Sequence, residues 1–284
     1  MGRRFRSAQK PGDLTPTEIH IHPRGKGWLM PSTRKAVQRV VAASLLILAF
    51  TPATAGASPP NVTSMVVSRA GILLQPKTVS AHSFTIPVGS RRCTIAEGTP
   101  LAALKATGIV FHVKDFARCS TVPSASSGLF VDRILTTTNK GTSGWSFKVN
   151  NRAATAGAAD SKGPFGTGPL ADGDKVVWFW CVFDSNWACQ RNLVVSAPAS
   201  AAPGSTVTVT VSAIDDFGGS IPASRAKVSV GSATAITAAD GTARLKLPST
   251  GATASIRAVD GIAASTRYVQ RVPSFPQQIS LSAG

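Results

Sequence analysis

The segment 175–181 (KVVWFWC) constrains the fold more than any other part of the sequence, because large apolar side chains occupy both of its faces. Successive side chains of a strand point to opposite faces of a sheet. By this alternation the two faces are Val177, Phe179 and Cys181 on one side and Val176, Trp178 and Trp180 on the other. A strand that is apolar on both faces is covered on both. The segment therefore predicts a central strand with a helix packed on one side.

The segment 144–150 (GWSFKVN) alternates without a break between apolar and polar residues, which predicts a second strand. Its expected faces are Trp145, Phe147 and Val149 inward, and Ser146, Lys148 and Asn150 outward. An Asn-Asn pair and a Gly/Pro-rich loop separate the two segments. Together they give a strand–loop–strand unit.

One helix is expected in the same part of the chain. Thr99 is placed to cap its first free N–H groups, Pro100 suits its first turn, and Gly108 suits its end. Further strands are expected within residues 64–75, 78–88, 109–114 and 128–135. His112 falls on the more polar face of one of them, and we expect it to be a half-exposed strand residue, not a catalytic base.

Several motifs in residues 64–191 resemble one widespread bacterial family. They are CxxxEGTPLAAL from Cys93, GLFVDRI from Gly128, GWSFKVNNRAATAGAAD from Gly144 and PLADGDKVVWFWC from Pro169. The family is the uncharacterised exported domain related to the C-terminal domain of transcobalamin and intrinsic factor. The resemblance implies a β-grasp-like α+β fold, a sheet with a helix across it, for residues 62–191. In the vertebrate carriers this domain helps to hold cobalamin beside a large helical domain, so the resemblance alone makes cobalamin a possible ligand.

Residues 192–274 carry short alternating segments at regular spacing, which predicts a β-sandwich. The clearest is 206–213 (TVTVTVSA), and the Asp240-Gly241 and Asp260-Gly261 pairs are typical of hairpin turns. The stretch AADGTARL from Ala238 resembles bacterial immunoglobulin-like or carboxypeptidase-regulatory-like modules. Residues 275–284 are expected to form a loose tail. The fold class predicted for the chain is mainly β: a β-grasp-like domain followed by an Ig-like sandwich.

Residues 30–57 predict an export signal. A short basic segment precedes the apolar run 40–50, and small residues follow, with Ala55-Gly56-Ala57 as an A-x-A cleavage site. The apolar run has about eleven residues, whereas a membrane-spanning helix needs roughly twenty. Residues 1–29 lie ahead of this signal and are expected to be an unstructured extension. We therefore expect a secreted or surface-associated protein without a transmembrane anchor in its mature form.

All four cysteines follow the predicted signal. An even number in an exported chain predicts two disulfides, and four cysteines allow three connectivities. Proximity in the sequence favours the pairs Cys93–Cys119 and Cys181–Cys189. A zinc site is the alternative, but the chain lacks paired C-x-x-C motifs with nearby histidines.

The net charge of +17 does not by itself indicate a nucleic-acid-binding protein. Residues 1–39 carry nine Lys or Arg against two acids, a net +7, which leaves +10 spread over the rest. No basic run or recognition motif accompanies that remainder, so we expect no specific nucleic-acid partner, only weak association with anionic polymers. Neither a nucleophile elbow nor a set of metal ligands is evident, so we expect no enzyme, metal or obligatory cofactor.

Two functions without catalysis remain open for what we expect to be a monomer. In the first, Trp178, Trp180 and Trp187 form an aromatic surface for an unknown ligand or envelope polymer. In the second, the protein is a structural or adhesive envelope spacer without a small-molecule ligand, and Trp178 and Trp180 are core residues. Burial of these two side chains distinguishes the hypotheses.

Overall fold

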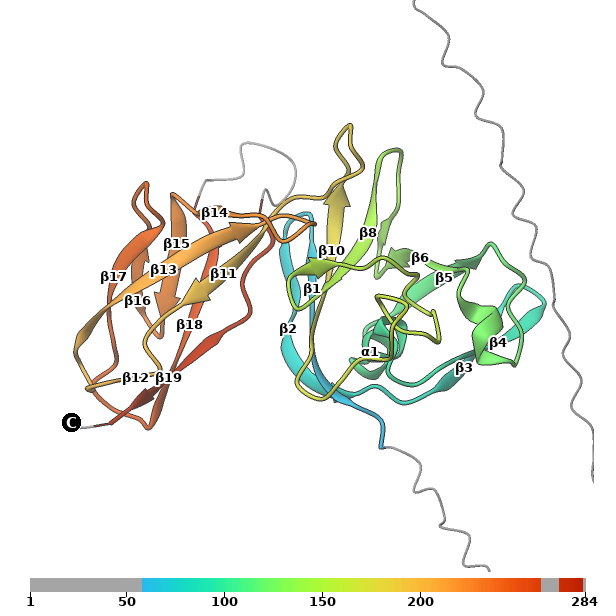
Figure 1. Cartoon of the computed structure of the whole chain (residues 1–284), viewed down its shortest axis with the longest axis horizontal. Helices are drawn as coiled ribbons and strands as arrows, with labels where there is room; N and C mark the ends of the chain where they lie inside the picture. The colour runs from blue at the N-terminus through green and yellow to red at the C-terminus, as the bar shows by residue number, and fades with distance from the viewer. Residues whose placement is uncertain (1–57, 262–270, 283–284) are drawn as a thin grey trace, which may run out of the picture. The chain divides into compact units, whose positions relative to one another are not determined.

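The computed structural model describes residues 58–261 and 271–282, which form several β-sheets and one α-helix (Figure 1). The predicted extension 1–29 and the predicted signal 30–57, with Ala55 and Ala57, lie outside these residues. Within the described ranges, no helix has the length and apolar character needed to cross a membrane. The described residues build three hydrophobic clusters: a large one within residues 62–182, a second from Leu193 onward, and a smaller one that brings Met65 and Phe179 together with Val272.

A five-stranded sheet organises the N-terminal part, residues 61–182. Its strands, in spatial order, are β2 (Gly71–Ser80), β1 (Asn61–Ser68), β10 (Lys175–Val182), β8 (Ser143–Val149) and β9 (Arg152–Ala153). β1 runs parallel to β10, and the other neighbours are antiparallel. The prediction that residues 175–181 form a central strand is therefore confirmed. The apolar run 64–75 is two strands, because the chain turns at Arg69-Ala70 and β2 pairs back on β1.

Helix α1 (Pro100–Ala106) covers one face of this sheet (Figure 1). Thr99 caps it as predicted, since its hydroxyl accepts a hydrogen bond from the Ala102 N–H at 3.2 Å. The helix buries Leu101 and Leu104 against the Val176, Trp178 and Trp180 face of β10. The alternation read from the sequence thus assigned both faces of β10 correctly.

Two small sheets lie on the α1 side of the N-terminal part (Figure 1). One is a hairpin of β3 (Phe84–Val88) and β4 (Arg91–Ile95). The other has the order β5 (Phe111–Asp115), β6 (Leu129–Ile134) and β7 (Thr137–Thr138), with the 3-10 helix η1 (Pro123–Ser126) between β5 and β6. The Cys93–Cys119 disulfide joins β4 to the connection after β5. Cys181–Cys189 is the second disulfide, so the pairing favoured by proximity is confirmed.

Residues 192–281 form two facing sheets around one core, the sandwich. One sheet contains β11 (Asn192–Ser196), β13 (Thr206–Ile214), β14 (Ser220–Pro222) and β17 (Thr242–Lys246). The other contains β12 (Ser200–Ala201), β19 (Gln277–Leu281), β18 (Thr253–Asp260), β15 (Ala226–Val230) and β16 (Ala233–Ile236). The apolar side chains of β13 are buried at alternate positions, as its sequence predicts.

The predicted loose tail, residues 275–284, is wrong. Residues 277–281 form β19, which pairs with β18 and with β12, so the sandwich continues beyond residue 274. The physical reason is a short alternation, QQISL, in which Ile279 and Leu281 are buried in the sandwich core. Only two apolar positions mark this strand, which is too few to stand out in a polar, proline-flanked segment.

Candidate functional site

The three tryptophans predicted to form a ligand surface do not come together as one. Trp178 and Trp180 are 1% and 4% exposed, whereas Trp187 is 73% exposed. Trp178 packs against the Phe147 ring, with centroids 5.1 Å apart, and Trp180 meets the Trp145 ring edge-on at 5.8 Å. The prediction of a shared aromatic surface is therefore wrong, because α1 and the small sheets cover this face of β10.

Trp187 lies in the short loop that the Cys181–Cys189 disulfide closes. The Asp184 carboxylate accepts hydrogen bonds from the backbone N–H groups of residues 186 and 188, at 2.8 and 3.0 Å, and so holds the loop. The Trp187 ring contacts Phe183 at 6.0 Å and is otherwise open to solvent. Trp187 is thus an exposed ring beside a half-buried Phe183, which packs against the cluster of Met65 and Phe179.

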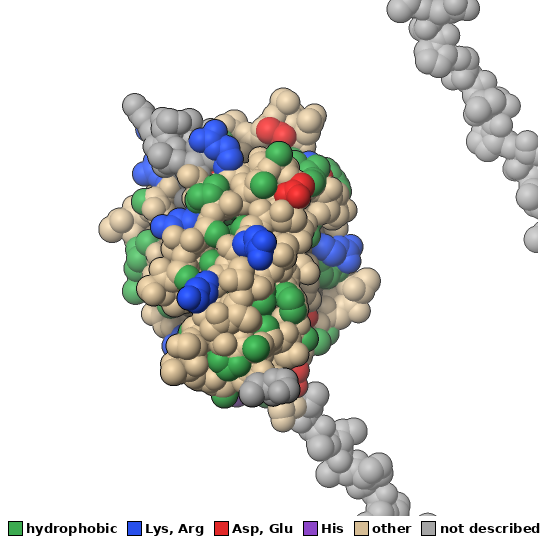
Figure 2. All heavy atoms as spheres, turned by 90° about the vertical axis from the view of Figure 1, so that its left-hand side faces the viewer, with side chains coloured by type: hydrophobic (Ala, Val, Ile, Leu, Met, Phe, Trp, Pro, Cys, Tyr) green, Lys and Arg blue, Asp and Glu red, His purple; other side chains and the backbone are tan. Residues whose placement is uncertain are grey.

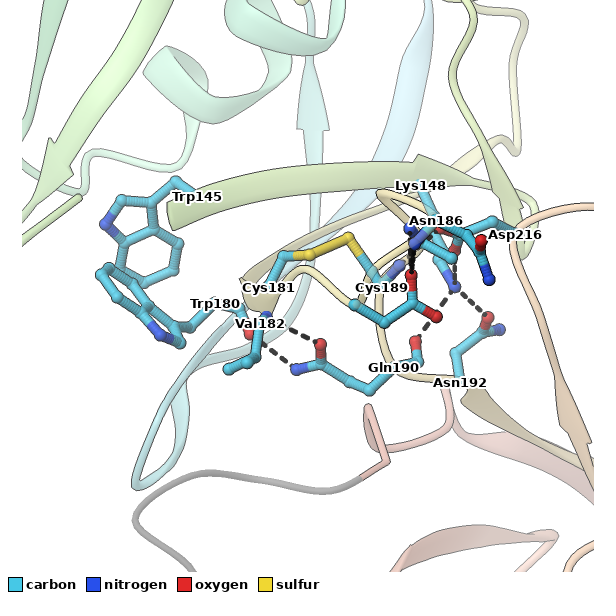
Figure 3. The surroundings of a disulfide bond; sticks show 12 residues. Trp145, Lys148, Trp180, Cys181, Val182, Asn186, Cys189, Gln190, Asn192 and Asp216 are labelled. Atoms are coloured by element: carbon cyan, nitrogen blue, oxygen red, sulfur yellow. Dashed lines mark hydrogen bonds and ion pairs between the residues drawn. A yellow bond between two sulfur atoms is a disulfide. The ribbon is translucent and has the colours of Figure 1, made fainter. Parts of the chain in front are cut away.

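The loop after the disulfide instead builds a buried polar cluster around Lys148 (Figure 3). Lys148 was expected to point outward, and that reading of its exposure is wrong, because its exposed fraction is 0%. Its Nζ lies 2.7 Å from Asp216 Oδ1, and it donates to Asn192 Oδ1 at 3.2 Å and to the Gln190 carbonyl oxygen at 3.3 Å. Asp216 Oδ2 in turn accepts the Cys189 N–H at 2.8 Å.

The face of the five-stranded sheet that bears Lys148 also contacts residues that lie after residue 191 in the sequence. Val177, Phe179 and Cys181 of β10 form a cluster with Met65 and Val67 of β1 and with Val272. Asn192 also donates to Asn151 Oδ1 at 2.7 Å. The alternation of β8 correctly separated two faces, but on the face predicted to point outward Lys148 is buried and Ser146 is half-buried.

Burial of the Lys148 ammonium lowers its pKa below the ordinary value of 10.5, and the hydrogen bond and charge of Asp216 oppose this shift. The ring of Phe179, 5.5 Å from Nζ, adds a further favourable contact for a cation. The polar partners of the Lys148 ammonium are oxygen atoms of Gln190, Asn192 and Asp216. The cluster is therefore a structural joint between the five-stranded sheet and the sandwich.

A groove on the other side of the sheet is the best candidate for a binding site. It runs between the β3–β4 hairpin and β5 and consists of two adjoining hollows of about 360 and 450 Å³. The hollows share Val88, Gly89, His112 and Val113 in their walls. Such volumes suit a small ligand or a few residues of a peptide.

The polar side chains beside this groove form one hydrogen bond and one ion pair. His112 Nδ1 lies 2.6 Å from Asp132 Oδ1, and Lys114 Nζ lies 3.6 Å from Asp132 Oδ2. Asp132 reaches both because it sits at the irregularity where the β5–β6 register shifts by one residue. The His112 side chain is 53% exposed, as the alternation of its strand predicted.

Asp115 closes the second hollow and pairs with Arg91 across the groove, Nη1 to Oδ2 at 3.0 Å. Burial raises the pKa of Asp115, but hydrogen bonds from the N–H groups of Ala117 and Cys119 and from Arg91 outweigh it, so the pKa lies below its ordinary value. The carboxylate is thus fixed as an anion whose acceptors are already in use. It holds the groove wall in shape.

Chemically, the groove offers one imidazole oriented by a carboxylate, together with lysines. Within the described residues no group of three or more His, Cys, Asp or Glu is placed to hold a metal ion.

The face of the sandwich shown in Figure 2 bears Lys and Arg singly among small apolar areas, with few acids. The groove was missed in the sequence because two hairpins form it. The one sequence signal near the groove is the more polar face of the segment 109–114, which carries His112 and Lys114.

Compared with models of known protein families and with curated proteins, the chain matches none.

Proposed function

We propose that the chain is an exported, non-catalytic protein in which the N-terminal part binds an extracellular ligand and the sandwich serves as its stalk. The groove along β5 carries this proposal: it is a hollow outside the packed core, lined by apolar side chains, lysines and an imidazole. The proposal does not rest on Trp178 and Trp180, because both side chains are buried.

The arrangement of the five-stranded sheet supports the resemblance to the transcobalamin-related domain. Two central parallel strands, β1 and β10, flanked by antiparallel neighbours and covered by one helix, are what a β-grasp-like fold requires. The facing sheets of residues 192–281 likewise support an Ig-like module. A corrinoid therefore belongs among the ligands to test, on the strength of the resemblance.

Export is the second part of the proposal. Two disulfides and no free cysteine among the described residues are typical of proteins from oxidising compartments. The expected mature protein begins at Ser58, after the A-x-A site. N-terminal sequencing of protein recovered from the culture medium tests this. Protein found inside the cell with residues 1–57 intact would refute it.

The alternative function is a structural or adhesive spacer, and two observations favour it. Trp178 and Trp180 are buried, and the cluster around Lys148 joins the sheet to the sandwich through a buried ion pair. A spacer needs such a joint and needs no ligand. The binding hypothesis, by contrast, requires the groove to respond to an added molecule.

Amide NMR spectra of the ¹⁵N-labelled mature protein decide between the two. We expect one member of a panel of corrinoids, glycans and peptides to shift the amides of residues 86, 88–91 and 108–116, which line the groove. The amides of β13, in the sandwich, serve as the internal control. If no panel member at millimolar concentration moves the groove amides, the spacer function is favoured.

A further inference from the structure

β5 has one free edge, and that edge faces the groove. The sheet order β5–β6–β7 leaves β5 with a partner on one side only. On that side the Val110 carbonyl accepts from the Leu135 N–H at 2.9 Å, and the Phe116 N–H donates to the Gly128 carbonyl at 3.2 Å. Backbone groups of a strand alternate between its two edges. The N–H and C=O groups of the odd-numbered residues Phe111, Val113 and Asp115 therefore point to the free edge.

These edge groups have no other backbone partner in the structure as described. Among residues 58–261 and 271–282, the backbone hydrogen bonds made outside the strand ladders do not involve Phe111, Val113 or Asp115. Residues 108–113 line one hollow and residues 112–116 the other, so the two hollows adjoin the edge, with Val113, which is 5% exposed, in the wall of both. A row of unpaired backbone groups beside open space is a template for an added strand.

The opposite wall of the groove, formed by β3, is a poorer edge for pairing with an added strand. β3 carries Pro87, which has no N–H to donate, and its ladder partner is β4. Exposed apolar side chains stand at the two ends of β5, where Val110 is 69% exposed and Phe116 is 75% exposed. An added strand would gain its hydrogen bonds from β5 and apolar contacts from these ends.

The charges of the groove select the kind of strand. Its lining residues include the cations Lys105, Arg91 and Lys114 and the acid Asp115, which pairs with Arg91, while Asp132 beside the groove pairs with Lys114. Lys114 is 60% exposed at its side chain and Arg91 is 47% exposed, so both remain within reach of a partner. A second copy of this basic chain would be repelled, whereas an acidic segment is attracted.

We infer that the groove takes an extended acidic peptide segment of a partner protein, which pairs as an added strand with the free edge of β5. The inference rests on the proposed binding function of the groove and names its class of ligand. Main-chain hydrogen bonds between the peptide and β5 would give the affinity, and acidic side chains of the peptide beside Lys105 and Lys114 would give the specificity.

Fluorescence anisotropy with a labelled octapeptide of alternating Val and Glu, acetylated and amidated at its ends, tests the inference. We expect it to bind the mature protein at least tenfold more tightly than the same peptide with Lys in place of Glu. The amides of Phe111 and Val113 are expected to shift and to exchange more slowly with solvent. Equal binding of the two peptides overturns the charge argument.

N-methylation of the peptide tests the strand pairing without changing the protein. Methyl groups on one alternating set of peptide nitrogens should weaken binding at least tenfold, and methyl groups on the other set should not. If both sets are tolerated, or if polyphosphate competes as well as the acidic peptide does, pairing with β5 is wrong. On the protein side, Lys105→Glu is expected to weaken binding about tenfold, and Lys140→Glu, at an exposed position away from the groove, should not.

The possible failures are distinguishable. If every strand peptide fails while a corrinoid or glycan shifts the groove amides, the ligand class is wrong and the binding function stands. If nothing shifts them, both are wrong. A concentration-dependent dimer whose interface protects β5 would show that a second copy occupies the edge, and this also overturns the inference.

Discussion

Neutralising Asp216 is expected to destabilise the folded protein strongly, because it leaves a buried cation without its partner. At the 2.7 Å separation of Lys148 Nζ and Asp216 Oδ1, the attraction of two unit charges amounts to about 6 kcal/mol at an effective dielectric constant of about 20. In Asp216→Asn the amide oxygen can still accept the Cys189 N–H, which offsets part of this loss. We expect the free energy of unfolding to fall by about 3–5 kcal/mol at pH 7.

The pH dependence separates lost charge pairing from lost packing. Burial lowers the pKa of Lys148 below 10.5, although Asp216 opposes the shift, and removing Asp216 lowers it further. Between the folded-state pKa and 10.5 the unfolded chain binds more protons than the folded one, so stability rises with pH in that window. The deficit of Asp216→Asn relative to the native protein should therefore shrink as pH increases from 7 to 9.5.

Urea unfolding followed by tryptophan fluorescence, with both disulfides intact, measures these differences. Glu97→Gln, an equal change of charge at an exposed position, is the matched control and is expected to shift stability by less than about 0.5 kcal/mol. The double variant Lys148→Met, Asp216→Asn, which removes both charges, should be more stable than Asp216→Asn alone. A deficit below about 1 kcal/mol, or one that stays constant with pH, would refute the reasoning.

Three further changes test other parts of the structure by the same unfolding assay. Thr99→Ala removes the cap of α1 and should cost about 1 kcal/mol, whereas Thr99→Ser should restore most of it. Replacing Cys181 and Cys189 by Ser opens a short loop and should cost about 2.5 kcal/mol, and no loss would show that the loop is held by other contacts. Gly163→Ala, at φ +79°, places a methyl group against a carbonyl oxygen of its own loop and should cost at least about 1–3 kcal/mol; a neutral result would contradict this loop conformation.

Local alternation was enough to predict the faces of β10 and β8, because a strand's side chains must alternate whatever surrounds it. Alternation does not say what covers a face. Lys148 was read as outward and exposed, and the residues that bury it, Asn192 and Asp216, lie 44 and 68 positions further along the chain. No signal within seven residues of sequence can report a contact of that range.

The candidate site was missed for a related reason. Tryptophan side chains are large and rare, and they occur in protein cores as well as on binding surfaces. Trp178 and Trp180 are buried and therefore belong to the core. The groove, in contrast, lies between β3 and β5, each of which has only one neighbouring strand in its sheet. Which strand ends a sheet depends on the order of all its strands, and the sequence gives no local sign that β5 is such a strand.

The joint and the groove lie on opposite sides of the five-stranded sheet, and this separates stability from binding. Lys148 and its partners belong to the side that contacts Val272, whereas β5 packs through Val113 into the core on the α1 side. Asn192, Asp216 and Val272 thus contact the first side, and the groove lies on the other. Asp216→Asn should weaken folding without changing affinity for the acidic peptide at low temperature, and Lys105→Glu should weaken binding without changing the urea midpoint. If Asp216→Asn lowers affinity while the protein is still folded, the joint shapes the groove, and the sandwich is part of the binding module and not only its stalk.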